Sequence, residues 1–559
     1  MNDSRGTAHC NIAALLPQLA ATRGEQLALR CPGSRRIGGG MARYDQTLSY
    51  RQLEQRSNAI AAGLRHCGLL AGERAAVMVR PTPEFFLLMF ALFKIGVVPV
   101  LIDPGIARSA LKRCLADADP QAFIGVPLAH AARVALGWAR SARLLVTVGR
   151  RWPWGGKTLA EVEALGADAA APTINTVGDD TAAILFTSGS TGLPKGVVYR
   201  HRHFVAQVEL LRTAFNVPPG GTDLPTFPPF ALFGPALGLT SIIPDMDPTR
   251  PAQAEPRRLL DAMRRFDVDQ LFGSPALIAV LARHGIPLPG LRRVMSAGAS
   301  VPPQVVEQFR ALLPAQAQFW TPYGATECLP VTVIEGAELA QTRPDSERGA
   351  GICVGHPVPG NLVRIIGISD GPLPEWHDSL LLKNGAIGEI TVVGPSTTDS
   401  YFRRPEANAL AKIRESLEGG GERIVHRMGD LGWLDAAGRL WFCGRKSHRV
   451  LTESGGLYTE QVEPVFNVHP DVHRSALVGV GEKGRQRPVL CVELNAGVAR
   501  DAQPRVLAEL QHLALGHAHS ARVETFLVHR KFPVDIRHNA KIGREALAAW
   551  ATRELAAQR

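Results

Sequence analysis

The sequence predicts an α/β plus α+β protein. We expect a large N-terminal domain of layered αβ subdomains with a small barrel-like β subdomain, followed by a small mobile C-terminal α+β domain. The chain has 559 residues, whereas single hydrophobic cores stop growing at about 250–300 residues. Helix and strand patterns alternate up to about residue 352, which is typical of α/β layers around a mostly parallel sheet. Short strands separated by glycines follow.

Each expected element follows from a local pattern. Leu53, Ile60 and Leu64 lie at helical spacing, whereas short apolar runs indicate buried strands. In chain order we expect a helix at 53–64, a strand at 74–79, a helix at 83–94, a buried strand at 97–102, a strand at 182–186, and short strands at 270–272, 293–296 and 318–320.

The later part of the chain has a different pattern. Residues 388–393, 432–435 and 439–442 form short strands punctuated by glycines, which favours an antiparallel or barrel-like subdomain. A polar stretch follows Gly444, and a compact α+β pattern runs from there to residue 559. The predicted domains therefore span residues 1–445 and 446–559.

The net charge of +11 suggests a nucleic-acid partner, but the distribution of the charge argues against one. The chain has 62 Lys and Arg against 51 Asp and Glu, and only 10 of the basic residues are lysines. The arginines are scattered along the chain, whereas nucleic-acid-binding proteins usually gather basic residues in runs or stripes. We expect a solvated, arginine-rich surface and no nucleic-acid partner.

The sequence also predicts a cytoplasmic protein that is not transmembrane. Its 8 cysteines include no C-x-x-C pair and are expected to be reduced thiols. The N-terminus has an acidic Asp3 and only a short apolar run, so it is a poor signal peptide. The most apolar stretch, residues 85–102, is interrupted by Lys94, Gly96 and Pro99, and it falls short of the ~20 apolar residues of a membrane span.

The most informative segment is the loop after the strand at 182–186. It reads Thr187-Ser-Gly-Ser-Thr-Gly-Leu-Pro-Lys195-Gly196. Its glycines let the backbone turn tightly and present amides to an anion, and Lys195 adds a charge suited to phosphate. A flexible linker is the alternative, but the loop directly follows a buried strand. A Walker A motif would need Ser or Thr after the lysine, so a motor or switch NTPase is disfavoured.

This loop resembles the signature of the adenylate-forming superfamily, which comprises acyl-CoA synthetases, peptide-synthetase adenylation domains and luciferases. Other matching segments lie in the same order along nearly the whole chain. They are residues 48–53, residues 94–104, Ala297-Gly-Ala299, Tyr323-Gly-Ala-Thr-Glu327, Gly429-Asp430, Gly444-Arg445 and Lys541-Ile-Gly-Arg544.

The resemblance implies the chemistry of a site. Such enzymes join a carboxylate to the α-phosphate of ATP, so ATP and Mg²⁺ are the expected cofactors, with Glu327 as the Mg²⁺ ligand. Lys541, Thr326, Glu327 and Lys195 are the expected catalytic residues. Tyr323 is expected to stack on adenine, with a core tyrosine as the alternative. The implied nucleotide-binding residues are Thr187, Ser188, Gly189, Ser190, Thr191, Gly192, Lys195, Ala297, Gly298, Ala299, Tyr323, Gly324, Ala325, Thr326, Asp430, Arg445 and Lys541.

Several positions depart from the common superfamily pattern. Ala231 stands where acyl-CoA synthetases usually carry a histidine, and Ser447 stands at the hinge, where Asp or Lys is typical. Residues 451–458 replace the stretch that shapes a thiol tunnel, and the segment before Lys541 is longer than usual. These changes argue against the use of CoA while they leave the adenylation residues intact.

The same variants, with residues 321–330, resemble the β-lactone synthetases of bacterial long-chain olefin biosynthesis. This resemblance implies that a 2-alkyl-3-hydroxy fatty acid is converted through an acyl-adenylate to a β-lactone, with release of AMP and pyrophosphate. A long-chain fatty acyl-CoA ligase or fatty acyl-AMP ligase is the alternative. A non-catalytic nucleotide-binding or basic interaction protein is a third hypothesis. The resemblance also implies association with the decarboxylase, reductase and condensing enzyme of the olefin pathway.

Phe227, Phe230, Phe233 and Leu237 are candidates for an apolar acyl pocket, although core packing explains them equally well. Two other signals are expected to be incidental. The G-x-G-x-x-G pattern at 479–484 has no clear helix after it, so a dinucleotide site is disfavoured. The histidines at 512, 517 and 519 lack the paired cysteine or carboxylate spacing of a metal site.

Overall fold

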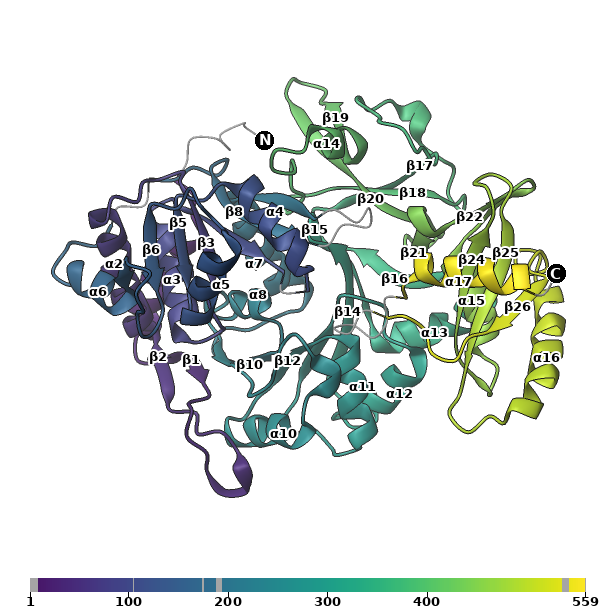
Figure 1. Ribbon diagram of the computed structural model, residues 1–559, viewed down its shortest axis with the longest axis horizontal. Helices are drawn as coiled ribbons and strands as arrows, with labels where there is room; N and C mark the ends of the chain where they lie inside the picture. Colours follow the sequence, from purple (N-terminus) through teal and green to yellow (C-terminus); the bar gives the residue numbers. More distant parts are fainter. Residues whose placement is uncertain (1–8, 104, 173–174, 188–193, 535–541, 558–559) are drawn as a thin grey trace.

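The computed structural model describes residues 9–103, 105–172, 175–187, 194–534 and 542–557 (Figure 1). Two large sheets, of seven and fourteen strands, form the body of the molecule, and a sheet of three strands lies near the C-terminus. Helices lie between and around the sheets, so the predicted α/β plus α+β fold class is confirmed.

The seven-stranded sheet has the order β7-β6-β5-β3-β4-β8-β9. All neighbouring strands are parallel except β8 and β9, which pair antiparallel on either side of the predicted phosphate loop. Its strands are β3 (Arg74–Met78), β4 (Val98–Ile102), β5 (Ala122–Gly125), β6 (Leu144–Thr147), β7 (Lys157–Thr158), β8 (Thr181–Thr187) and β9 (Lys195–Arg200). The helices in this part of the chain are α2 (Tyr50–His66), α3 (Pro83–Lys94), α4 (Arg108–Ala118), α5 (Pro127–Leu136) and α6 (Leu159–Leu165).

The fourteen-stranded sheet is parallel from β1 through β11, β10, β12 and β13 to β14, and antiparallel beyond that. Its strands are β1 (Leu27–Cys31), β2 (Gln46–Ser49), β10 (Thr222–Pro225), β11 (Thr240–Ile242), β12 (Gln270–Gly273), β13 (Arg293–Ser296), β14 (Gln318–Ala325), β15 (Cys328–Glu335), β16 (Ile352–Pro357), β17 (Leu362–Ile366), β18 (Gly388–Val393), β19 (Lys412–Ser416), β20 (Glu422–Leu434) and β21 (Leu440–Arg445). The accompanying helices are α1 (Leu15–Arg23), α7 (His201–Ala214), α8 (Pro228–Ala231), α9 (Phe233–Ala236), α10 (Pro256–Arg265), α11 (Pro275–His284), α12 (Pro303–Arg310), α13 (Gly336–Glu347) and α14 (Pro405–Ala411).

Helix α3 is buried between the two large sheets, since it contacts β4 of one sheet and β1 and β2 of the other. Its apolar residues are buried on every side of the helix, which explains why this stretch is the most apolar of the chain. Lys94 is buried at its end, and its Nζ donates to Glu54 Oε2 and Ser57 Oγ at 2.7 and 2.8 Å. These partners satisfy a buried ammonium group that would otherwise be costly.

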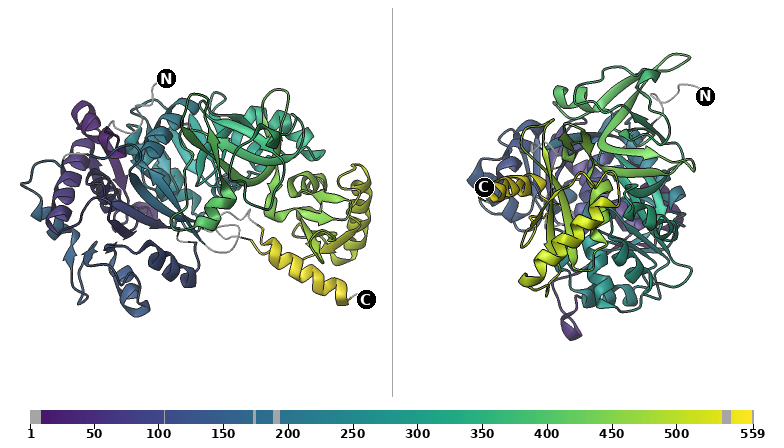
Figure 2. Two further views of the ribbon diagram at one scale, coloured as in Figure 1. Left: turned by 90° about the horizontal axis from the view of Figure 1, so that it is seen from above. Right: turned by 90° about the vertical axis from the view of Figure 1, so that its right-hand side faces the viewer.

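The residues from Val450 onward form their own hydrophobic cores, which share no residue with those of the preceding chain. The three-stranded sheet has the order β24-β25-β26 and lies at one end of the molecule in Figures 1 and 2. Its elements are β22 (Val450–Thr452), β23 (Gly455–Leu457), α15 (Thr459–Asn467), β24 (Val472–Val480), β25 (Arg487–Leu494), α16 (Gln503–Leu515), β26 (Thr525–Val528) and α17 (Arg544–Ala557).

Most predicted elements agree with the structure. The helix expected at 83–94 is α3, and the one at 53–64 lies within α2, which begins at a Ser49–Gln52 capping box. The strand expected at 318–320 is too short, because β14 continues to Ala325.

All 8 cysteines are free thiols. Within the described ranges, none of the helices combines the length and the apolar character of a membrane span.

Candidate active site

A cavity of about 1880 Å³ lies where the predicted motifs meet. It is lined by residues at the carboxyl ends of β3, β4 and β8 in one sheet and of β10, β12 and β13 in the other. Ligands of open α/β sheets bind at the carboxyl ends of the strands. The predicted nucleotide-site and hinge residues that line the cavity are Thr187, Lys195, Ala297, Gly298, Gly324, Ala325, Thr326, Glu327, Asp430, Arg445 and Ser447.

Six predicted residues, namely Ser188, Gly189, Ser190, Thr191, Gly192 and Lys541, lie outside the described residues. The two ends of the phosphate loop are defined, since Thr187 of β8 pairs with Lys195 of β9. Lys195 Nζ lies 5.2 Å from the centre of the Tyr401 ring, at the cavity wall. This position directs one positive charge into the cavity.

Glu327 lies in the tight connection between β14 and β15, where Ala325 pairs with Cys328. The backbone N and Oγ1 of Thr398 donate to the Glu327 carbonyl oxygen at 2.8 and 3.0 Å. The phenol of Tyr401 donates to Glu327 Oε1 at 2.6 Å. Burial, and then the nearby Glu327, raise the pKa of Tyr401, so its hydroxyl remains a proton donor at neutral pH. The Glu327 carboxylate is therefore held in place at the cavity wall.

The fixed carboxylate suits a hard cation. Mg²⁺ prefers oxygen ligands and usually combines one or two carboxylates with substrate phosphates. The hydrogen bond from Tyr401 uses Oε1, and no hydrogen bond to Oε2 is found in the part of the chain that the structure describes. The residues present therefore fit Mg²⁺: Glu327 would hold the ion, and the ion would neutralise phosphate charge.

Asp430 lies on β20, directly after Gly429, whose φ of +70° favours glycine. The Tyr323 phenol donates to Asp430 Oδ2 at 2.7 Å, and Arg445 Nε lies 3.8 Å from Asp430 Oδ1. Burial raises the pKa of Asp430, and Arg445 opposes that rise. Such a carboxylate can accept hydrogen bonds from the hydroxyls of a sugar at the cavity wall.

A family model described as AMP-binding enzyme matches residues 19–402, which is more than half of the chain. The chain belongs to this family of AMP-binding enzymes. It is 64% identical over 553 residues to an olefin β-lactone synthetase of Xanthomonas campestris, covering 99% of each chain, and 64% identical over 546 residues to that of Stenotrophomonas maltophilia, covering 98% of this chain and 99% of the relative. The predicted adenylate-forming ligase class is thereby confirmed.

A solved structure has a similar fold. The amide bond synthetase from Marinactinospora thermotolerans superimposes on this AMP-binding enzyme with a TM-score of 0.76, at 23% identity, and the match covers 97% of this chain and 99% of the other. At this level of identity the likeness concerns the fold alone.

Two predicted nucleotide residues of the AMP-binding enzyme, Ala299 and Tyr323, are not among the residues that line the cavity. The Tyr323 ring packs against the core of the antiparallel strands, with Phe442 at 5.9 Å, and reaches the site through its hydroxyl. The sequence predicts either a ring that stacks on adenine or a core tyrosine. The structure places the ring against the core strands, and stacking on a nucleotide stays a prediction.

The four candidate acyl-pocket residues divide into two groups. Phe227 and Phe230 line the large cavity. Phe233 and Leu237 line a separate cavity of about 30 Å³, which Phe230 also borders. The Phe230 ring stacks on Phe272 at 4.0 Å, so it forms the wall between the two spaces. A chain in the large cavity would contact Phe227 and Phe230 directly.

Three further groups were not predicted from the sequence of this AMP-binding enzyme. Tyr401 is the first, and it lies 74 residues from the carboxylate that it holds. Lys412 is the second: burial lowers its pKa to about 8, although Glu327 opposes that change, and its Nζ donates to the Thr398 carbonyl oxygen. The scarcity of lysine, with 10 in the whole chain, was the available signal in the sequence for Lys412.

The third group is a buried ion cluster beside the predicted hinge residue Ser447. Glu389 Oε2 pairs with Arg427 Nη2 at 2.7 Å, and both side chains are about 1% exposed. Lys446 Nζ lies 2.8 Å from Glu389 Oε1. These three residues line the cavity together with Arg445 and Ser447. The cluster anchors the backbone immediately before the C-terminal elements.

Proposed function

We propose that this chain is an ATP-dependent β-lactone synthetase of olefin biosynthesis. It converts a 2-alkyl-3-hydroxy fatty acid through an acyl-adenylate to a β-lactone, with release of AMP and pyrophosphate. The observation that carries the proposal is 64% identity to two olefin β-lactone synthetases over 98–99% of the chain. Adenylation joins two anions, so neutralisation and positioning of charge account for most of the catalysis.

In the proposed first step, Lys195 and the loop from Thr187 hold the β- and γ-phosphates of ATP. Glu327, held by Tyr401, would bind Mg²⁺, which neutralises phosphate charge when it is bound. Thr326 donates to the α-phosphate. Lys541 stabilises the negative charge that concentrates on the α-phosphate and the carboxylate oxygens in the transition state.

The sugar and base of the nucleotide complete the proposed site. Asp430 accepts hydrogen bonds from the ribose hydroxyls, and Arg445 lies beside the same carboxylate. Ala297 and Gly298 border the position of the adenine at the cavity wall. Tyr323 positions Asp430 through its 2.7 Å hydrogen bond.

In the proposed second step, the 3-hydroxyl oxygen of the substrate attacks its own acyl carbon. The new C–O bond closes a four-membered ring, the bond between the acyl carbon and the AMP oxygen breaks, and the hydroxyl proton is lost. The attack is intramolecular, so orientation of the bound chain replaces a second substrate. The proposal therefore includes no CoA, and the apolar wall at Phe227 and Phe230 excludes water from the reactive ester.

We propose two functional domains, residues 1–445 and 446–559, with a hinge at Ser447. The first holds ATP and the acyl substrate, and the second carries Lys541. Support comes from the separate hydrophobic cores on either side of this point. The proposed location is the cytoplasm, where free cysteines are usual. A β-lactone yields an olefin by losing CO₂, so we further propose association with a decarboxylase and with the reductase and condensing enzyme that supply the substrate.

The test is incubation with ATP, Mg²⁺ and a synthetic 2-alkyl-3-hydroxy fatty acid, with and without CoA. We expect a product that has lost one water, equimolar AMP, and no effect of CoA. An acyl-CoA product that forms only when CoA is present would establish the alternative fatty acyl-CoA ligase. An acyl-adenylate that accumulates without ring closure would indicate a fatty acyl-AMP ligase.

A further inference from the structure

The segment between Asp119 and Glu161 has an uneven charge. It contains no acidic residue, and it contains six basic ones and three of the chain's 8 tryptophans. The basic residues are Arg133, Arg140, Arg143, Arg150, Arg151 and Lys157. This is a local concentration of positive charge in a chain whose arginines are otherwise spread out, and it includes α5 and the edge strand β7.

Exposed apolar side chains lie in the same segment. Leu128, Val134 and Leu136 of α5 are 74%, 60% and 47% exposed, and Trp152 is 56% exposed. The Trp152 ring lies 5.5 Å from that of Trp154, which in turn stacks on His130 of α5 at 5.4 Å. These ring contacts place the exposed Trp152 close to α5.

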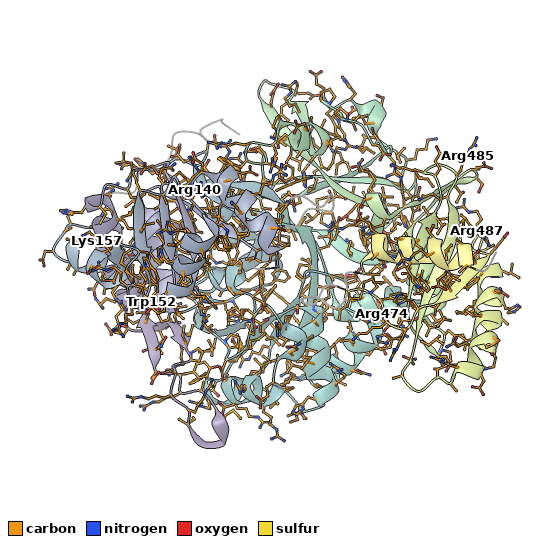
Figure 3. The ribbon with its side chains drawn as sticks, viewed as in Figure 1. Arg140, Trp152, Lys157, Arg474, Arg485 and Arg487 are labelled. Atoms are coloured by element: carbon orange, nitrogen blue, oxygen red, sulfur yellow. The ribbon has the colours of Figure 1, made fainter. Side chains whose placement is uncertain are left out.

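We call this region the α5 surface and define it by seven exposed residues. It comprises Leu128, Val134, Leu136, Arg140, Arg150, Trp152 and Lys157. Figure 3 labels Arg140, Trp152 and Lys157, which lie at the end of the molecule opposite the C-terminal elements.

Much of the charge on the α5 surface is not neutralised by the protein. Arg143 pairs with Glu73 at 2.6 Å and Arg151 with Glu161 at 3.2 Å. For Arg140, Arg150 and Lys157, by contrast, no ion pair occurs within the described ranges. Exposed apolar side chains that gather in one region, with basic groups around them, mark a candidate interaction surface.

The α5 surface also lies next to the large cavity. Trp138 follows α5 by two residues, is 7% exposed, and lines the cavity. Met78, Ile102 and Leu111 line the same apolar end. One residue, Gly137, thus separates the exposed end of α5 at Leu136 from Trp138 in the cavity wall.

We propose that the α5 surface docks on an anionic lipid membrane. Leucine and tryptophan side chains partition into the boundary between headgroups and acyl chains, and Lys and Arg attract anionic headgroups. A nucleic-acid site would not need exposed aliphatic side chains, which makes the lipid surface the better fit. Docking of this kind is peripheral.

Membrane docking would place the apolar end of the cavity beside the lipid phase. This consequence rests on the proposed function, because a long-chain hydroxy acid and its lactone both partition into lipid. The docking itself depends only on the α5 surface, so a binding assay without any substrate tests it separately from the lactone chemistry.

The experiment is co-sedimentation of the full chain with vesicles. One set consists of phosphatidylcholine, and the other contains phosphatidylglycerol in addition. We expect binding to the anionic vesicles and weak binding to the neutral ones. Added salt should weaken binding to the anionic vesicles, because salt ions screen the attraction between charges. Absence of binding to anionic vesicles at physiological salt would overturn the proposal.

Two matched leucines provide the control. Leu128 on α5 is 74% exposed, and Leu515 at the end of α16 in the C-terminal part is 72% exposed. Leu128→Asp should weaken vesicle binding about tenfold or more, because it removes a buried apolar group from the bound state. Leu515→Asp should leave it unchanged. Equal effects of the two substitutions would overturn the assignment to α5.

Two charge variants test the electrostatic contribution to vesicle binding. Arg140→Ser and Lys157→Ser should each weaken binding to anionic vesicles about fivefold, as expected for one basic residue near the surface. ATP–pyrophosphate exchange with a short soluble acid should be unchanged, which shows that the variants fold. Binding of duplex DNA or self-association that depends on these residues, without vesicle binding, would contradict the proposal.

Discussion

Substitution of Tyr401 by phenylalanine tests how the Mg²⁺ carboxylate is positioned. The phenol donates to Glu327 Oε1 at 2.6 Å, and Tyr401→Phe removes that hydroxyl while it keeps the ring beneath Lys195. A hydrogen bond to a charged group contributes about 1.5–3 kcal/mol, which corresponds to a loss of about 10- to 100-fold. We expect this loss in carboxylate-dependent ATP–pyrophosphate exchange, with a shift to higher Mg²⁺ concentration.

The control is Tyr50→Phe, which also removes a buried phenol. Tyr50 Oη donates to the Leu239 carbonyl oxygen at 2.8 Å within the hydrophobic core. This variant should lower the melting temperature and leave the Mg²⁺ dependence unchanged. If Tyr401→Phe kept the parent's exchange rate at every Mg²⁺ concentration, Tyr401 would have no role in positioning Glu327.

Three further predictions follow from the site and the core. Lys541→Ala should abolish adenylation and leave ATP affinity nearly intact; equal loss of both would contradict its role in the transition state. Asp430→Asn should weaken AMP binding about tenfold in calorimetry, and unchanged affinity would exclude it from the ribose site. Burial, and then Asp269, raise the pKa of Asp223 from 3.8 to about 7, so the fold loses stability as pH rises from about 4 to 7. Asp223→Asn should therefore raise the melting temperature more at pH 8 than at pH 5, and equal shifts would refute this.

The sequence predicted the buried elements well because their patterns are local. Both ends of helix α3 were predicted correctly, because its apolar run begins at Pro83 and ends before Gly96, and these residues mark helix boundaries. Strand β14 was predicted too short, because it continues through Thr321, Pro322 and Tyr323. Proline and polar residues are uncommon in buried strands, so the sequence pattern did not indicate a strand there. Pairing with β15 determines its length, and that is a long-range interaction.

The site residues that belong to local motifs were predicted from the sequence, and those that depend on long-range contacts were missed. Glu327 and Asp430 belong to short motifs that can be recognised one segment at a time, and both line the cavity. Tyr401 contacts a carboxylate 74 residues away, and the charge of the same Glu327 carboxylate acts on Lys412, so no local pattern indicates either residue. The division of the phenylalanines between two cavities also depends on packing, since Phe230 forms the wall only where it stacks on Phe272.

The product formed in the absence of CoA tests the central claim most directly. The chain, ATP, Mg²⁺ and a 2-alkyl-3-hydroxy fatty acid are incubated without any thiol, and the product is examined by mass spectrometry and NMR. The account predicts a β-lactone, one water lighter than the acid, formed in equal amount with AMP. Unchanged acid without thiol, together with acyl-CoA when CoA is added, would contradict it.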